Sequence, residues 1–366
     1  MDVLLDAEEL DFVVAPTWEA GKPVKKLSKD RTREIEAVQT RFVDFSGGVL
    51  SQDGRYLATG LTEDTLLSQD TPSLPPAFAR YVREHGGKLH VLDPYAWDLP
   101  QLVAEGNVDS VAVLPDALRL DGDVAKFAGR ALKDTKYQGK HGIGKYAQAI
   151  YFHLLNCGLR IAPSACSSSG ECKNPPGYNR VYVACGQYFN AKTWWENLLE
   201  GKSIVSNGPV LRVRANDQLP GYVFRGEPGA TVKLTISCNL GTRQKVEYLE
   251  IIQNGLVTES VRLDEWAKAN GKLPPIEFEQ SGWFCVRAYA PGEENYRVAL
   301  SAPFYVDFGT PRVSKKSAQF FVEWVYDQGR RIQASKLAKS EKLIRLRELK
   351  AARDYWQRLA QSAEDR

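Results

Sequence analysis

Short apolar runs alternate with helix-like patterns over residues 1–206. Residues 78–84, which follow two prolines, and residues 146–155 have the apolar spacing of helices that cover a sheet. Three apolar runs are too short for helices and end in turn residues, which predicts strands buried on both faces of a parallel sheet. They are residues 12–15, 89–92 and 110–114. This alternation predicts an α/β layer or a partial barrel for the first region.

The apolar pattern changes to every second residue between residues 207 and 310. Val232, Leu234 and Ile236 alternate with polar side chains, which is the period of a half-buried strand. The pair Asn254-Gly255 predicts a tight hairpin turn, because both residues tolerate a positive φ. Several strands of this kind predict an antiparallel β-sandwich module.

Residues 311–366 have a helical pattern, and no proline occurs between residues 312 and 362. Phe320, Phe321 and Trp324 share one helical face, and Gly329 is expected to interrupt the pattern. We therefore predict one long helix or two consecutive helices. We expect the aromatic face to pack on the body and the residues after 330 to be dispensable for the fold.

The charge balance argues against a dedicated nucleic-acid binder. The chain of 366 residues has 48 Lys and Arg against 45 Asp and Glu, a formal net charge of +3. The positive charge is concentrated in residues 330–353, where nine Lys and Arg accompany two acids. We interpret this segment as a solvated helix face and expect no specific nucleic-acid partner, with a nucleic-acid or anionic-lipid patch as the alternative.

Targeting signals are not evident in the sequence. No run of about 18 apolar residues exists, so we expect no transmembrane segment. The first residues, MDVLLDAEEL, lack the basic start and cleavage site of a signal peptide, so the chain as written is expected to stay in the cytoplasm.

Three groups of residues are candidates for metal or phosphate chemistry. His90 lies at the end of a predicted strand, with Asp93 and Asp98 close behind, where ligands gather in α/β folds. His153 and Cys157 share a helix face, so zinc binding there is an alternative. Residues 139–146 match the core of a phosphate-binding loop, but Tyr146 stands where a Ser or Thr should hold magnesium. We interpret that segment as a glycine-rich loop that opens a helix.

Five segments together resemble the CehA/McbA branch of the PHP-like metallohydrolases, the superfamily of polymerase and histidinol phosphatase domains. They are residues 151–165 (YFHLLNCGLRIAPSA), 174–183 (NPPGYNRVYV), 206–209 (SNGP), 246–252 (VEYLEII) and 281–284 (SGWF). The resemblance covers residues 80–330 well and the first 80 loosely. It implies a distorted α/β barrel of the PHP type, metal-dependent hydrolysis and a β-rich module after the barrel. Relatives are often exported, so the resemblance leaves the compartment open.

The chain departs from this family at most metal-ligand positions. The family's first strand carries Asp-x-His-x-His, and this chain has no His-x-His; Met1 is expected to lie just beyond that strand, as in a truncated or degenerate member. Residues 43–48 contain no Glu, and residues 165–169 contain no carboxylate. The ligands that remain as candidates for one divalent cation, zinc, manganese or iron, are His90, Asp93, Asp116 and His153.

Two functions follow from this resemblance. The first is a weakened or inactive metal-dependent hydrolase of ester, phosphoester or carbamate bonds, in which the cation would act as Lewis acid and hydroxide source. The second is a non-catalytic protein that retains the fold and binds a ligand or a protein. The hydrolase would act on a small-molecule substrate, and the non-catalytic protein would bind a small-molecule ligand or a protein. The candidates for contact with it are Asp98, Asn156, Ser164, Asn179 and Arg180.

Overall fold

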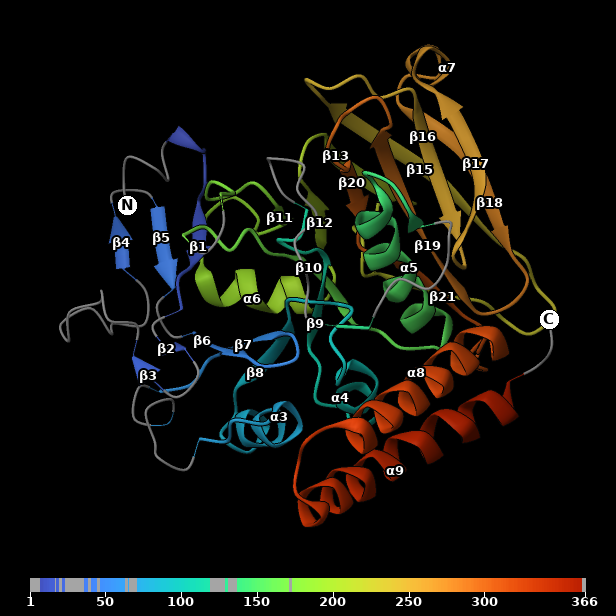
Figure 1. Cartoon of the computed structure of the whole chain (residues 1–366). Helices are drawn as coiled ribbons and strands as arrows, with labels where there is room; N and C mark the ends of the chain where they lie inside the picture. Colours follow the sequence, from blue (N-terminus) through green and yellow to red (C-terminus); the bar gives the residue numbers. More distant parts are fainter. Residues whose placement is uncertain are drawn as a thin grey trace. The chain divides into compact units, whose positions relative to one another are not determined.

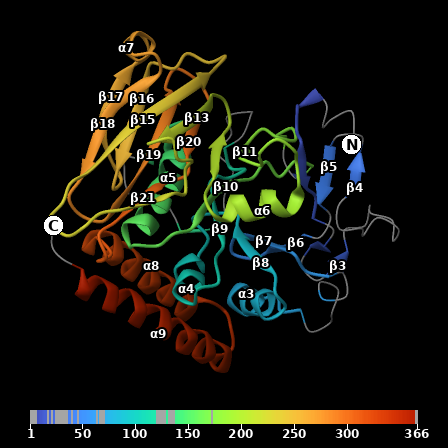
Figure 2. The same ribbon diagram turned by 180° about the vertical axis from the view of Figure 1, so that it is seen from behind.

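The chain is a mixed α/β protein that divides into two compact units (Figures 1 and 2). Unit 1 comprises residues 1–112, 126–131 and 318–362, and unit 2 comprises residues 113–125, 132–317 and 363–366. The computed structural model describes residues 7–16, 18–19, 22–23, 36–38, 41–44, 47–62, 65, 71–118, 129–130, 137–170 and 173–363. The mixed α/β class predicted from the sequence is confirmed.

Unit 1 is built on a mixed sheet with the strand order β9-β8-β7-β6-β2-β3. Strands β6, β7 and β8 pair antiparallel, as do β2 and β3, whereas β8 pairs in parallel with β9 and β2 with β6. The predicted strands at residues 89–92 and 110–114 do pair in parallel, but the sheet is mixed and not parallel throughout, because short loops such as Gln52 to Gly54 return the chain as hairpins. A separate small sheet has the order β1-β5-β4. The strands are β1 (Phe12–Val14), β2 (Trp18–Glu19), β3 (Lys22–Pro23), β4 (Glu36–Val38), β5 (Arg41–Asp44), β6 (Gly48–Ser51), β7 (Arg55–Thr59), β8 (Lys88–Val91) and β9 (Ser110–Leu114), the last of which ends in unit 2.

Among the described residues of unit 1, four helices contribute to the core. They are α3 (Pro75–Glu84), α4 (Leu99–Ala104), α8 (Lys315–Ala334), whose first turn belongs to unit 2, and α9 (Lys339–Ser362). Helix α3 begins with two prolines, whose fixed φ suits the first turn, and it buries Phe78 and Val82. Helices α8 and α9 lie side by side in both views (Figures 1 and 2). The Phe321 and Trp356 rings stack between them, with centroids 4.4 Å apart.

The break in the C-terminal helical region is not at Gly329, as predicted, but at residues 335–338. A Cβ at Gly329 would lie 3.7 Å from Leu349 Cδ2, so the glycine sits inside α8 where α9 packs closely. The expectation that residues after 330 are dispensable stays a prediction, and the packing of α9 argues against it. Leu349, Ala352 and Trp356 of α9 are buried in the core, and the Trp356 indole N–H donates to the Pro100 carbonyl at 2.9 Å.

Unit 2 contains two β-sheets that share one hydrophobic core, the arrangement of a β-sandwich. The larger sheet has the order β11-β12-β20-β19-β16-β17, with β21 beside β19 and β14 beside β21; the smaller has the order β13-β15-β18. The predicted hairpin turn is confirmed, since Asn254 and Gly255 have φ values of 51° and 85° between β16 and β17. The strands are β10 (Ala162–Ala165), β11 (Arg180–Val183), β12 (Ser203–Ser206), β13 (Val210–Ala215), β14 (Val223–Arg225), β15 (Val232–Gly241), β16 (Tyr248–Gln253), β17 (Leu256–Arg262), β18 (Lys272–Phe278), β19 (Gly282–Ala290), β20 (Arg297–Ser301) and β21 (Phe304–Asp307).

Helix α5 (Gly142–Asn156) packs against the larger sheet of unit 2. A Cβ at Gly144 would lie 2.2 Å from the Tyr296 ring, so this glycine is required by packing. At the other end of the helix, the Trp283 indole N–H donates to Asn156 Oδ1 at 2.9 Å. The glycine-rich loop opens the helix four residues earlier than expected, at Gly142. The described part of unit 2 also contains two short helices, α6 (Ala191–Leu199) and α7 (Leu263–Lys268).

The strands that the structure describes do not close into a barrel. The PHP-like barrel therefore stays a prediction, as do the regions 1–206, 207–310 and 311–366. Strand β12 pairs with β20 across the predicted boundary at residue 206, and helices α8 and α9 belong mostly to the same compact unit as residues 1–112. Among the helices of the described residues, none combines the length and the apolar character that crossing a bilayer requires.

Candidate functional site

His90, the leading metal-ligand candidate, lies on β8 with both ring nitrogens beside hydroxyl groups. Its Nε2 is 2.9 Å from Thr59 Oγ1, and its Nδ1 is 2.8 Å from Ser110 Oγ. The side chain is 3% exposed, and this burial lowers the pKa of His90 to about 4. The ring is therefore neutral at pH 7, and a metal ion could reach a nitrogen only by displacing a hydroxyl that hydrogen-bonds to it.

Asp93 follows β8 and is held by Arg55 of β7. The Arg55 Nη2 donates to Asp93 Oδ1 at 2.7 Å, and its Nε donates to Oδ2 at 3.0 Å. The Arg55 backbone N–H also donates to Oδ2, at 3.0 Å. Both carboxylate oxygens are thus used in a two-pronged ion pair.

Asp98 precedes helix α4 and accepts a hydrogen bond from the Gln328 side-chain amide at 2.7 Å. Burial, reinforced by the charge of Asp53, raises the pKa of Asp98 to about 7. The hydroxyl of Tyr56, which is fully buried, has a pKa well above its usual value through burial and the charge of Asp98. The ionised forms of Asp98 and Tyr56 are therefore unfavourable in the folded state of unit 1.

The other two metal candidates belong to unit 2. Asp116 is 7% exposed, and its main-chain carbonyl accepts a hydrogen bond from the Asn174 side chain at 3.3 Å. His153 lies on α5 with its Nδ1 at 2.9 Å from Ser317 Oγ. Burial raises the pKa of the neighbouring Cys157 thiol to about 12, which disfavours the thiolate that zinc requires.

The predicted substrate-contacting residues of unit 2 lie at several places. Ser164 is a buried residue of β10. Asn179 is also buried and donates from its side chain to the carbonyls of Pro115 and Cys166, at 3.1 and 2.8 Å. Arg180 Nε donates to the Gly177 carbonyl. Asn156 accepts from the Trp283 indole N–H, and no hydrogen bond among the described residues joins it to Asn179.

The donor set does not fit a divalent cation. Within the part of the chain that the structure describes, no three His, Cys, Asp or Glu side chains gather in a way that could hold a metal ion. The reason is visible at His90 and Asp93, where hydroxyls and a guanidinium already use the atoms that would ligate. These residues therefore support no hydrolytic step through a metal.

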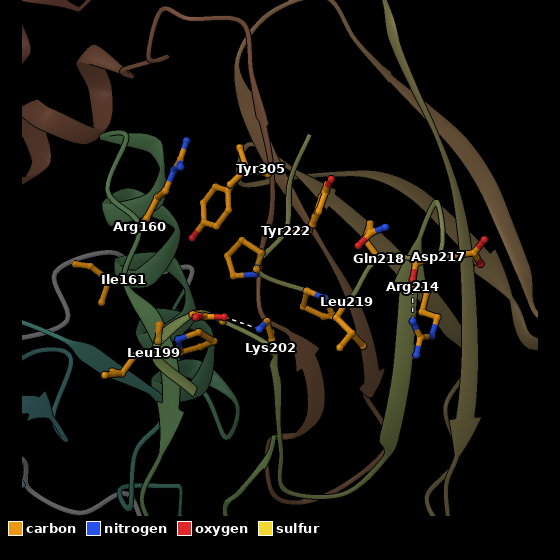
Figure 3. A pocket seen from close by; sticks show the side chains of 18 residues that line it. Arg160, Ile161, Leu199, Lys202, Arg214, Asp217, Gln218, Leu219, Tyr222 and Tyr305 are labelled. Atoms are coloured by element: carbon orange, nitrogen blue, oxygen red, sulfur yellow. Dashed lines mark hydrogen bonds and ion pairs between the residues drawn. The ribbon is translucent and has the colours of Figure 1, made fainter. Parts of the chain in front are cut away.

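A cavity of about 590 Å³ lies elsewhere in unit 2, at the start of β10 and beside the loops that precede β12 and β14 (Figure 3). Its wall is largely apolar, with contributions from Leu199, Leu219 and Pro303. This volume falls in the range of small-molecule sites. Tyr305 and Tyr222 lie between Arg160 at one end of the pocket and Arg214 at the other (Figure 3).

Three cationic side chains line this pocket. The Arg160 guanidinium lies 5.2 Å from the centre of the Tyr305 ring and forms an ion pair with Asp307. Lys202 pairs with Glu200 at 2.5 Å. The remaining cation, Arg214, donates only to the main-chain carbonyl of Asp217, at 2.7 Å, so its charge is not balanced by a carboxylate among the described residues.

Local backbone geometry sets the shape of the pocket. Asn216 and Asp217 have positive φ values of 42° and 63°, which turns the chain sharply after β13 and brings the Asp217 carbonyl to Arg214. Gly221 has φ 85°, and a Cβ there would lie 2.0 Å from the Glu200 carbonyl. Only glycine allows the two loops to approach this closely.

Sequence reasoning missed this pocket entirely. Its residues come from strand ends and loops that no motif links, and the Pro220-Gly221 pair indicates a turn and nothing more. The predicted residues Asp116 and Asn179 belong instead to the segments after β9 and before β11.

Comparisons with known proteins give no family for the chain. No family model matches it, and no curated protein matches it. Among solved structures, the neutron crystallographic structure of a Jonesia denitrificans lytic polysaccharide monooxygenase aligns with 42% of this chain and 92% of that chain, at 10% identity and a TM-score of 0.16.

Proposed function

We propose that the chain is a ligand-binding relative of the PHP-like metallohydrolases, of the CehA/McbA branch, in which the hydrolytic metal site is lost. The resembling segments support the lineage, and they coincide with regular elements. Residues 151–165 form the end of α5 and strand β10, and residues 174–183 lead into β11. The first region then corresponds to an incomplete PHP-type barrel.

The state of His90 carries the proposal. A metal ligand of this kind needs an accessible nitrogen lone pair, with the second nitrogen donating to an orienting group. Here Thr59 and Ser110 occupy the two positions, and Asp93 is neutralised by Arg55. Both arrangements are satisfied hydrogen-bond networks without a cation, which favours a binding protein over a hydrolase.

The pocket of unit 2 supplies the binding site in this proposal. Its apolar wall would bury the body of a small organic molecule, and the unbalanced charge of Arg214 would attract an anionic group. We therefore assign it a small organic anion with a flat apolar body, which would lie against Tyr222 and Tyr305.

Metal analysis tests the loss of the hydrolytic site. We expect less than one equivalent of zinc, manganese or iron in the purified chain after dialysis against metal-free buffer. We also expect no hydrolysis of a nitrophenyl phosphate or ester above the rate of His153→Ala. Two stoichiometric metals, together with hydrolysis that His153→Ala abolishes, would contradict the proposal.

Calorimetric titration tests the pocket, with 2-naphthoate as the probe and naphthylmethylammonium as its cationic counterpart. We expect 2-naphthoate to bind and the cation not to bind. Arg214→Gln should weaken 2-naphthoate binding about tenfold, the effect of losing one charge-assisted hydrogen bond of about 1.4 kcal/mol.

Arg212→Gln is the matched control, because Arg212 is an exposed arginine of the same strand that does not line the pocket. Equal loss in the two variants, or equal affinity for the two probes, would show that the pocket is not the site.

A further inference from the structure

One face of helix α9 is exposed and basic. Lys339, Arg347, Lys350 and Arg358 are exposed along it, and Lys336 extends the face into the preceding turn. These five cations, together with Leu343 and Ile344, are called the α9 face below. The opposite side of the helix carries Leu349, Ala352 and Trp356, so the packing fixes which residues point outward.

The α9 face also exposes two adjacent aliphatic side chains. Leu343 is 64% exposed and Ile344 is 60% exposed, although both belong to a regular helix whose other apolar residues are largely covered. Leu343 lies one turn before Arg347 and two turns before Lys350, so the apolar pair stands within the row of cations. A merely solvated face has no need of these two residues.

The acids of α9 form their ion pairs with arginines outside this face, although the charges of Lys350 and Arg358 also act on Asp354. Glu341 pairs with Arg345 at 2.7 Å, Glu348 pairs with Arg80 at 3.0 Å, and Asp354 pairs with Arg353 at 2.7 Å. None of the five cations of the α9 face forms an ion pair with another described residue. The positive charge is therefore available to a partner.

We propose that the α9 face docks on an anionic lipid surface, an interaction that is independent of the pocket of unit 2. Lysine and arginine would contact lipid phosphates, and Leu343 and Ile344 would enter the boundary between headgroups and acyl chains. Nucleic acid is the weaker fit, because single strands bind by stacking on aromatic rings and this face presents none. Two aliphatic side chains and five cations favour weak, reversible, salt-sensitive binding.

Co-sedimentation of the full chain with lipid vesicles tests this assignment. We expect about tenfold more protein bound to vesicles of equal parts phosphatidylcholine and phosphatidylglycerol than to phosphatidylcholine alone. High salt should abolish the difference, since it screens the attraction. Equal binding to the two kinds of vesicle would overturn the proposal.

Variants separate the apolar and the charged contributions. The double variant Leu343→Gln/Ile344→Gln should lower binding to the anionic vesicles about fivefold or more, and Arg347→Gln/Lys350→Gln should lower it at least as much. Leu256→Gln removes an aliphatic side chain that is 71% exposed in unit 2, so it should leave binding unchanged. Circular dichroism should be the same for all variants, because the altered side chains are exposed.

Duplex DNA provides the competing outcome. Sub-micromolar binding that Arg347→Gln/Lys350→Gln abolishes and Leu343→Gln/Ile344→Gln leaves intact would assign the face to nucleic acid and overturn the lipid proposal. Loss of vesicle binding in the control Leu256→Gln would overturn it as well.

Discussion

The neutral, buried ring of His90 makes the stability of unit 1 sensitive to acid. Burial lowers the pKa of His90 to about 4 in the folded chain, against about 6.5 in the unfolded chain. Between these values the unfolded state binds the extra proton, so stability is complete above pH 6.5 and is lost as pH falls towards 4. The loss should be on the order of 3 kcal/mol.

Urea unfolding of the wild type and of His90→Gln at several pH values measures this effect. The free energy of unfolding of the wild type should fall more steeply between pH 6.5 and pH 4. Parallel pH profiles would show that His90 does not titrate in this way.

Asp98 has the opposite effect on stability. Burial and Asp53 raise the pKa of Asp98 to about 7, above the usual 3.8, so the folded state holds the proton that the unfolded state has lost. The free energy of unfolding contributed by Asp98 should fall as pH rises from about 4 to about 7 and stay low above that.

Asp98→Asn keeps the oxygen that accepts from Gln328 and removes the charge. In thermal melts we expect it to raise the melting temperature at pH 8 and to leave it nearly unchanged at pH 4. A lower melting temperature at pH 8 would mean that the charge of Asp98 is stabilising.

For single residues, the sequence predicts the place along a strand or helix better than it predicts which residues form hydrogen bonds with them. It places His90 at a strand end correctly, because the apolar run 89–92 is local information. The hydroxyls that cap its ring come from positions 31 and 20 residues away, which only the strand pairing of the sheet brings near. Whether His90 is able to bind a metal ion depends on which groups contact its ring, and the local sequence pattern does not contain that information.

Among the elements, α9 has its largest buried side chain at Trp356. Trp356 is fully buried, stacks on Phe321 and donates to the Pro100 carbonyl. Trp356→Ala should lower the free energy of unfolding of unit 1 by about 3–5 kcal/mol, the cost of a large core cavity. Trp356→Phe keeps an aromatic ring and should cost less, because it mainly leaves that carbonyl without its donor. If chemical denaturation shows that the two variants lose the same free energy of unfolding, the whole effect comes from the hydrogen bond.

Local sequence signals predict an element well where its backbone geometry requires particular residues. They predict poorly where contacts with distant parts of the chain decide the structure. The Asn254-Gly255 turn follows from the φ values that these residues tolerate, and it was found from the sequence. The helix break at Gly329 was wrong, because a glycine in a helix costs only about 1 kcal/mol and the close approach of Leu349 depends on a helix further along the chain.

For the whole molecule, the two compact units predict two unfolding transitions. Phe284 is fully buried in unit 2 and stacks on Phe304 with centroids 4.9 Å apart. In scanning calorimetry, Phe284→Ala should lower one transition and Trp356→Ala the other, since each cavity lies in a different core. A single transition that both variants lower equally would show that the chain unfolds as one cooperative body.

The order of strands in the sheets could not be predicted from the sequence. Its pattern indicates strands over residues 207–310, but β19 lies between β16 and β20, and β14 pairs in parallel with β21. Such pairings join residues far apart in the chain, so alternation alone does not select among them.

The interrupted path of the chain through unit 1 has a consequence for its synthesis. Residues 1–112 leave the ribosome before unit 2, yet α9, which anchors on α4 through a contact spanning 256 residues, is made after it. Nearly all of unit 2 emerges in between, so unit 2 can fold while the apolar surface of α3 and α4 is still uncovered. A stop between residues 318 and 338 would release a chain in which nearly all of unit 2 is made and the apolar surface that α9 covers stays exposed, and we expect such a chain to aggregate.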